Sequence, residues 1–212
     1  MELRLLSVNV GQPRIIGKRQ DAPVLSGIAK TPVADAIVHV RATNIDGDAQ
    51  ADLRVHGGAD KAVYCYPADH WPWWERERGM PCKAGTFGEN LTIEGADETA
   101  VAIGDRFQWG QALLEISQPR EPCYKFVMHV GRADAATSMT ASGRCGWYFR
   151  VLEEGSASTR EARLVRVESS GGPSVREAFI AALDPRTPAT TRARVAGAGG
   201  LAASWIKVLS RR

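Results

Sequence analysis

Residues 118–125, which read Gln-Pro-Arg-Glu-Pro-Cys-Tyr-Lys, combine the residue types most able to do chemistry. Their two prolines fix φ and stop a regular strand, so we expect a stiff, extended loop that holds Cys123. Arg120 and Lys125 flank the cysteine, and nearby cations favour the thiolate, which is the form that acts as a nucleophile or metal ligand. A cysteine can also pack as a small buried hydrophobe, and these residues alone leave both interpretations open.

Residues 56–61 form a second candidate site, suited to an anion. Gly57 and Gly58 follow His56, and adjacent glycines allow a close backbone approach or a positive φ. Backbone amides in such a turn can form an anion-binding nest, which His56 and Lys61 would flank. The alternative is an ordinary β-turn with a solvated lysine.

A third stretch brings polar groups to the start of a predicted strand over residues 91–93. Glu89 and Asn90 follow Gly88 in a glycine-bearing loop that enters this strand. Loop residues at the mouth of a strand often line a pocket. We therefore include Gly88, Glu89 and Asn90 among the candidate binding residues.

Composition limits the class of protein. The chain has 212 residues, of which 44% are hydrophobic and 24% charged, as in an ordinary soluble globular protein. No apolar run approaches the roughly 20 residues that span a bilayer, and the N-terminus is typical of a first strand, so we expect a cytoplasmic protein without a membrane partner. Its four cysteines include no C-x-x-C pair, which argues against a zinc knuckle and a disulfide scaffold. The net charge of +3 is too small to predict a nucleic-acid partner.

The order of the predicted elements indicates a mostly β (α+β) fold. Short apolar strands with glycine or proline punctuation are expected near residues 3–10, 24–33, 36–45, 101–116, 146–151 and 162–167. Helices are expected over 66–77, where three tryptophans should cover the core, and over 126–130 and 134–139. A flexible linker at 169–173 precedes three short helices, which have too little apolar surface to fold alone. They should dock on the β domain or on a second subunit, as in a homodimer.

Four motifs, in order, resemble those of MOSC domains, which are related to the C-terminal part of molybdenum cofactor sulfurases. They occupy residues 56–62, 87–91, 104–105 and 118–125. The chain most resembles the stand-alone YiiM-type members, which also carry a small C-terminal three-helix region. The resemblance implies a barrel-like MOSC domain over residues 1–168 that binds the molybdenum cofactor, a pterin dithiolene with a terminal phosphate, and a helical region over 173–212.

The same resemblance assigns roles to residues of this chain. It implies that Cys123 ligates the metal, and a thiolate is a suitable soft ligand for a transition metal. The cofactor, including its phosphate, needs amide donors and cations. The residues expected to bind it are Arg14, Lys30, His56, Gly57, Gly58, Lys61, Gly88, Glu89, Asn90, Arg120 and Lys125.

YiiM-type proteins are associated with the reduction of N-hydroxylated compounds, such as the base 6-hydroxylaminopurine, to amines. Cleaving the N–O bond requires a proton donor, for which we take His56 first and Asp48 second. Electrons should come from a separate reductase, because the chain shows no flavin, nicotinamide or iron–sulfur fingerprint. Cys65 stands where this family commonly has a histidine, which leaves a substrate contact or proton donor there in doubt.

Three other functions fit parts of the sequence. A non-catalytic cofactor carrier would share every ligand residue with the reductase. A sulfur-transfer protein or thiol enzyme would use Cys123 as a nucleophile without a metal. A base- or nucleic-acid-binding module would use the basic residues of the C-terminal tail.

Overall fold

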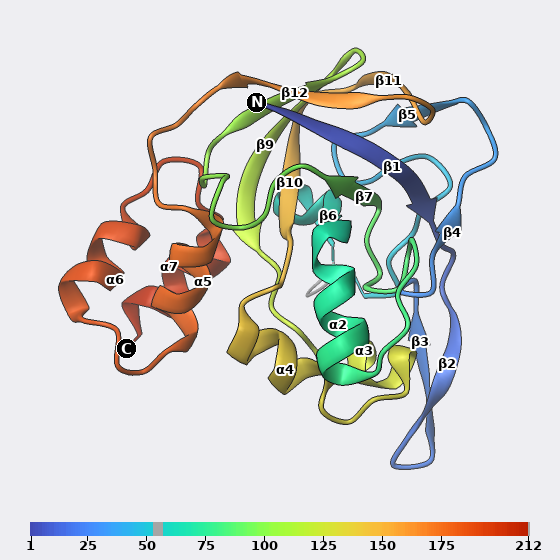
Figure 1. Cartoon of the computed structure of the whole chain (residues 1–212), viewed down its shortest axis with the longest axis horizontal. Coiled ribbons are helices and arrows are strands. Elements are labelled where there is room, and N and C mark those ends of the chain that lie inside the picture. Colours follow the sequence, from blue (N-terminus) through green and yellow to red (C-terminus); the bar gives the residue numbers. More distant parts are fainter. Residues whose placement is uncertain (53–56, 212) are drawn as a thin grey trace.

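The computed structural model describes residues 1–52 and 57–211, and a closed β-barrel forms its centre (Figure 1). Strand β1 pairs with β7 on one side and with β12 on the other, which closes a ring of seven strands. Neighbours in the ring are antiparallel except β6 and β7, which are parallel. In ring order the strands are β1 (Glu2–Val10), β12 (Arg163–Glu168), β8 (Arg106–Trp109), β9 (Ala112–Pro119), β10 (Trp147–Glu153), β6 (Val63–Pro67) and β7 (Leu91–Glu94). The mostly β, barrel-like fold predicted from the sequence is confirmed.

Strand alternation separates the barrel interior from its outer face, because successive side chains of a strand point to opposite sides. In β1, the buried Leu3 and Leu5 alternate with the exposed Glu2, Arg4 and Leu6. In β10, Trp147 and Phe149 are fully buried and their rings pack edge to face. Tyr148, between them, therefore lies on the outer face, where the candidate site is found.

A β-hairpin projects from the barrel (Figure 1) and consists of β2 (Arg14–Arg19) and β3 (Ala22–Ser26). The sequence predicted one strand over residues 24–33, and this is wrong. The chain leaves β3 after Ser26, and the short β4 (Thr31–Pro32) pairs with β1 instead. The interruption has a packing cause: a Cβ added at Gly27 would lie 2.1 Å from the carbonyl oxygen of Ala49. Near the barrel, β5 (Ile37–Val40) pairs with β11 (Gly155–Ser158).

Short helices lie on the outside of the barrel. They are the 3₁₀ turns η1 (Ala59–Lys61) and η2 (Ala68–His70) and the helices α2 (Trp71–Arg78), α3 (Tyr124–Val130) and α4 (Ala135–Ser142). Helix α2 begins at Trp71, because Pro67 still belongs to β6 and Pro72 occupies the first helical turn. Trp74 is buried, and its indole donates to the hydroxyl of Tyr66 at 2.6 Å. The other two tryptophans of α2 are partly buried against the same core.

The C-terminal helices α5 (Val175–Leu183), α6 (Ala189–Ala196) and α7 (Ala203–Ser210) form a cluster beside the barrel (Figure 1). Ser174 caps α5 by accepting a hydrogen bond from the backbone of Glu177, as its capping-box sequence predicts. The cluster docks on β9, where the amide of Ala202 donates to the carbonyl of Ser117 at 2.9 Å. Among the described residues, no helix is both long and apolar enough to cross a membrane.

Candidate functional site

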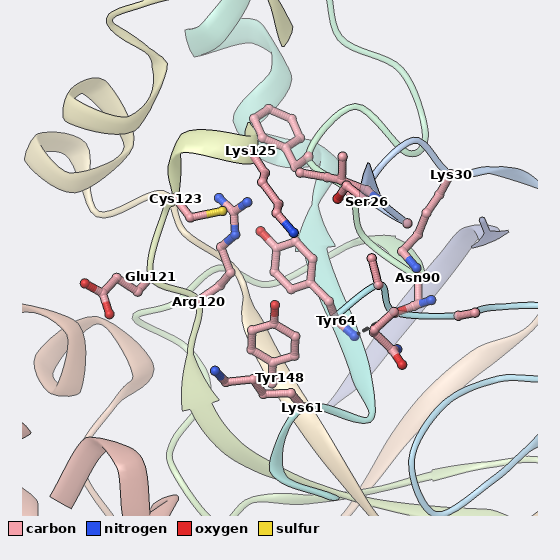
Figure 2. A pocket seen from close by; sticks show the side chains of 17 residues that line it. Ser26, Lys30, Lys61, Tyr64, Asn90, Arg120, Glu121, Cys123, Lys125 and Tyr148 are labelled. Carbon is pink, nitrogen blue, oxygen red and sulfur yellow. Dashed lines mark hydrogen bonds between the residues drawn. The ribbon is translucent and has the colours of Figure 1, made fainter. Parts of the chain in front are cut away.

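A pocket opens on the outer face of β6 and β10 (Figure 2). Tyr64 and Tyr148 are direct cross-strand neighbours, and their rings lie 5.0 Å apart at its floor. Loops from distant parts of the chain complete the walls. The lining residues are Ser26, Gly27, Ile28, Lys30, Ala49, Gln50, Ala51, Lys61, Tyr64, Phe87, Gly88, Asn90, Arg120, Glu121, Cys123, Lys125 and Tyr148.

Cys123 reaches this pocket from the loop that the sequence predicted. Strand β9 ends at Pro119, and α3 begins at Tyr124, so Cys123 is the N-cap residue. Its backbone is extended, with φ −130°, and its carbonyl accepts from the amide of Phe126 at 3.0 Å. The thiol is half-buried and makes no capping hydrogen bond of its own. The loop therefore leaves the sulfur available to a ligand in the pocket.

Arg120 is the buried cation of the site. It is 5% exposed, and Figure 2 shows its guanidinium beside Cys123. The guanidinium lies 4.7 Å from the ring centre of Phe126 and 5.5 Å from that of Tyr64, and Nη1 contacts the sulfur of Met139 at 3.1 Å. Among the described residues, no carboxylate lies within ion-pairing distance of it. A buried guanidinium without a carboxylate partner is costly, so its burial favours an anionic ligand.

Other cations surround the same space. Lys61 is half-buried, and burial lowers its pKa, an effect opposed by the charge of Glu121. The ammonium of Lys125 donates to the carbonyl of Leu25 at 3.0 Å, which ties α3 to the projecting hairpin. Glu121 is the one acidic residue among those that line the described pocket. The pocket therefore carries net positive charge.

Asp48 and Lys30 form a buried ion pair behind the pocket wall. The two carboxylate oxygens of Asp48 also accept from the amide of Gly11 and from the side chain of Asn90, both at 2.9 Å. Burial lowers the pKa of Lys30, and Asp48 opposes this shift. Asp48 does not line the pocket. Its contacts join three chain segments, so the structure places this predicted proton donor in a structural network.

Glu89 also lies behind the wall rather than in the pocket. Its carboxylate accepts from the amides of Gly85 and Phe87 at 2.8 and 2.9 Å and from the hydroxyl of Thr92 at 2.8 Å. Burial raises its pKa to about 7 despite these bonds. Gly88 does line the pocket, with φ +76°, and a Cβ there would lie 2.5 Å from the side chain of Ile28. The loop thus presents backbone to the pocket and keeps its carboxylate inside.

The predicted anion nest is only partly described. His56 lies outside the described residues, so its predicted roles in proton donation and binding stay predictions. Gly58 has φ +92° and accepts from the amide of Lys61 at 3.0 Å, as the first residue of a 3₁₀ turn does. Neither Gly57 nor Gly58 lines the pocket, whereas Lys61 does. Arg14 lies elsewhere, on the wall of a neighbouring pocket.

Sequence reasoning did not assign Tyr64, Tyr148 or residues 26–28 and 49–51 to the site. Strand alternation was the signal for Tyr148, because it lies between two large apolar residues of β10. Alternation also answers the question about Cys65, which lies on the opposite face of β6 from Tyr64. Cys65 is fully buried, and burial raises its pKa well above the ordinary value. It faces away from the pocket.

Metal ligands from the chain itself are few. Among the described residues, no group of three or more His, Cys, Asp and Glu side chains could hold a metal ion. A metal bound at Cys123 would therefore need most of its other ligands from a cofactor. Cys123 lines the open, cation-lined pocket, so such a group would bind there.

Comparisons with known proteins show which family the chain resembles. The sequence profile of the MOSC domain matches residues 52–169. Protein YiiM of Escherichia coli is 37% identical over 190 residues, which are 88% of this chain and 84% of that protein. The crystal structure of YiiM from Geobacillus stearothermophilus superposes with a TM-score of 0.82 at 34% identity, covering 99% of this chain and 98% of that one. A protein of Gibberella moniliformis named Reductase is 37% identical over 125 residues, which are 57% of this chain and 22% of that protein.

Proposed function

This chain belongs to the MOSC domain family, and we propose that it is a molybdenum-cofactor-dependent reductase that converts N-hydroxylated compounds, such as 6-hydroxylaminopurine, to amines. One observation carries the proposal. The half-buried thiol of Cys123 opens into a pocket whose buried cation, Arg120, has no carboxylate partner among the described residues. A soft metal ligand beside an unmatched positive charge suits an anionic metal cofactor.

The residues of the pocket fit that cofactor. Arg120, Lys61 and Lys125 supply cationic donors for a dithiolene and phosphate, and guanidinium and ammonium groups bind such anions strongly. Tyr148, a partly exposed ring that lines the pocket, supplies flat surface for a pterin ring. Cys123 would hold the metal. When bound, the cofactor supplies the metal centre that delivers two electrons to the N–O bond.

The chain's own residues would supply protons and exclude water. Burial lowers the pKa of Lys61, which makes its ammonium a stronger acid than that of a solvated lysine. Tyr148 carries a hydroxyl on the same wall, and burial raises the pKa of that group while the charge of Arg120 opposes the rise. Lys61 is therefore the better proton donor among the described pocket residues, and His56 stays a further candidate.

An external electron donor is part of the proposal. The chain has no recognisable flavin, nicotinamide or iron–sulfur motif. A relative over part of the chain is named Reductase, which supports a redox role. A cofactor carrier remains the second candidate, because binding alone would need the same pocket.

The first test measures molybdenum content and turnover in protein expressed with cofactor biosynthesis intact. We expect near-stoichiometric metal and reduction of 6-hydroxylaminopurine with reduced methyl viologen as electron source. Cys123→Ser should lose most of the metal and the turnover. Cys82→Ser is the matched control, because Cys82 is also half-buried but lies outside the pocket.

The variant Lys61→Met tests whether Lys61 acts in proton donation rather than in holding the cofactor. It should keep at least about half of the metal, since other cations remain, and lose at least about tenfold in turnover. Metal without turnover in the wild type would favour the carrier. Absence of metal from the wild type would overturn the molybdenum assignment.

A further inference from the structure

We propose that a second pocket, distinct from the one at Cys123, binds the phosphate group of a small molecule. It lies between β2, the 79–86 loop and the end of α3. The phosphate site itself rests on the charge and geometry of this pocket, whereas the assignment of the phosphate to substrate or cofactor rests on the proposed function.

The ionisable side chains that line this pocket are all basic. They are Arg14, Lys30, Lys83, His129 and Arg132, and no carboxylate lines the pocket among the described residues. Lys30 is already paired with Asp48. Arg132 has a partly exposed partner, Asp134, at 3.3 Å, which is a weak ion pair.

Arg14 and Lys83 are exposed, and within the described ranges neither side chain has an ion pair or a hydrogen bond. The charge of Arg14 is felt inside the pocket. Burial lowers the pKa of His129, and Arg14 lowers it further, while a hydrogen bond with the backbone of Gly85 opposes the shift. Asp48 and Asp134 balance Lys30 and Arg132, respectively. The charges of Arg14 and Lys83 have no such carboxylate partner among the described residues.

Helix ends offset only part of this charge. Helix α2 ends before Gly79 and α3 ends before Gly131, so both present C-terminal carbonyls near the pocket. A helix C-terminus carries roughly half of a negative charge. Arg132 lies over the first of these ends, with Nη1 3.9 Å from the position of a Cβ added at Gly79. The charges of Arg14 and Lys83 remain for a ligand.

A phosphate group matches this arrangement because it is a compact dianion with several acceptor oxygens. Arginine binds it through two parallel hydrogen bonds and lysine as a point charge. The pocket also adjoins the Cys123 pocket, since Lys30 lines both and one loop divides them, with Gly85 on one side and Gly88 on the other. The phosphate could belong to a nucleotide form of the substrate or to the cofactor.

The test compares binding of AMP, adenosine and inorganic phosphate to the full-length protein by calorimetry. We expect AMP and phosphate to bind, with adenosine weaker by at least about tenfold. The double variant Arg14→Ala/Lys83→Ala should weaken AMP and phosphate binding by at least about tenfold per lost cation. Lys18→Ala is the control, because Lys18 lies exposed on the same strand and lines neither pocket.

Two further measurements identify the source of the phosphate. A parallel loss of molybdenum in the double variant would assign the site to the cofactor. Unchanged molybdenum, with a raised KM for an N-hydroxylated nucleotide but not for the free base, would assign it to the substrate. The proposal is overturned if the wild type binds neither AMP nor phosphate, or if the double variant binds them as tightly as the wild type does. Neither result would bear on the metal at Cys123.

Discussion

Replacing Arg120 by methionine should have opposite effects on the metal-free and the cofactor-loaded protein. Arg120 is 5% exposed, and its neighbours are aromatic rings and the sulfur of Met139 rather than a carboxylate. In the metal-free protein the buried charge of Arg120 therefore lowers the free energy of unfolding. In the loaded protein it would be matched by the anionic cofactor.

The magnitudes follow from the contacts of Arg120. Burying an ion costs several kcal/mol. Each of the two cation–π contacts of the Arg120 guanidinium offsets about 0.5–2 kcal/mol of this cost. Methionine is apolar and flexible, so Arg120→Met should leave the unfolding free energy of the metal-free protein unchanged or raise it by about 1–4 kcal/mol. Loss of charge-assisted hydrogen bonds, worth about 1.5–3 kcal/mol each, should weaken cofactor retention by about tenfold or more.

Urea denaturation of metal-free protein and the molybdenum content of loaded protein test the two halves. Arg150→Met is the matched control, because Arg150 is partly buried but paired with Asp60 at 2.9 Å and Glu115 at 2.7 Å. That variant should be destabilised by about 1–3 kcal/mol. If Arg120→Met instead destabilises the metal-free protein by more than about 2 kcal/mol, or leaves molybdenum content unchanged, the argument from an unmatched buried charge fails.

Two buried carboxylates give the remaining predictions. Burial raises the pKa of Glu89 from 4.5 to about 7, so its ionisation is costlier in the folded than in the unfolded chain. The unfolding free energy should fall by roughly 3 kcal/mol as pH rises from about 4.5 through 7, at about 1.4 kcal/mol per pH unit, and Glu89→Gln should flatten this slope in urea titrations; equal slopes would contradict it. Asp48→Asn should cost about 3–5 kcal/mol because it strands the buried ammonium of Lys30, and adding Lys30→Met should recover part of the loss in a double-mutant cycle; strictly additive losses would contradict the pairing.

The strands and the Cys123 loop were predictable because local chemistry determines them, whereas the closure of the strands into a barrel was implied by the resemblance to MOSC domains. The alternation of Leu3 and Leu5 with Glu2 and Arg4 specifies a strand that is buried on one side. Pro119 and Pro122 prevent a regular strand from continuing, so the chain must leave β9 near Cys123. The capping residue Ser174 likewise indicates the start of α5. None of these inferences requires knowledge of the tertiary contacts.

The rest of the site depends on contacts between distant segments. The break after Ser26 follows from the close approach of Gly27 to Ala49, which no local pattern encodes. The hairpin strand over Arg14–Arg19 was missed because its two apolar residues are adjacent rather than alternating, and neither is fully buried: Ile15 is exposed and Ile16 is half-buried. Two residues with positive φ, Gln20 and Asp21, make its turn without a glycine.

The motifs mix two kinds of polar residue that sequence alone cannot separate. Asp48 and Glu89 direct their carboxylates behind the pocket walls, where amides and an ammonium satisfy them. Arg120 and Lys61 line the pocket itself. This separation has an electrostatic consequence: carboxylates in the pocket would cancel its positive charge, whereas buried behind the wall they stabilise the loops. The positive potential at Cys123 therefore depends on where the acids point, and a motif that records only residue types does not contain that information.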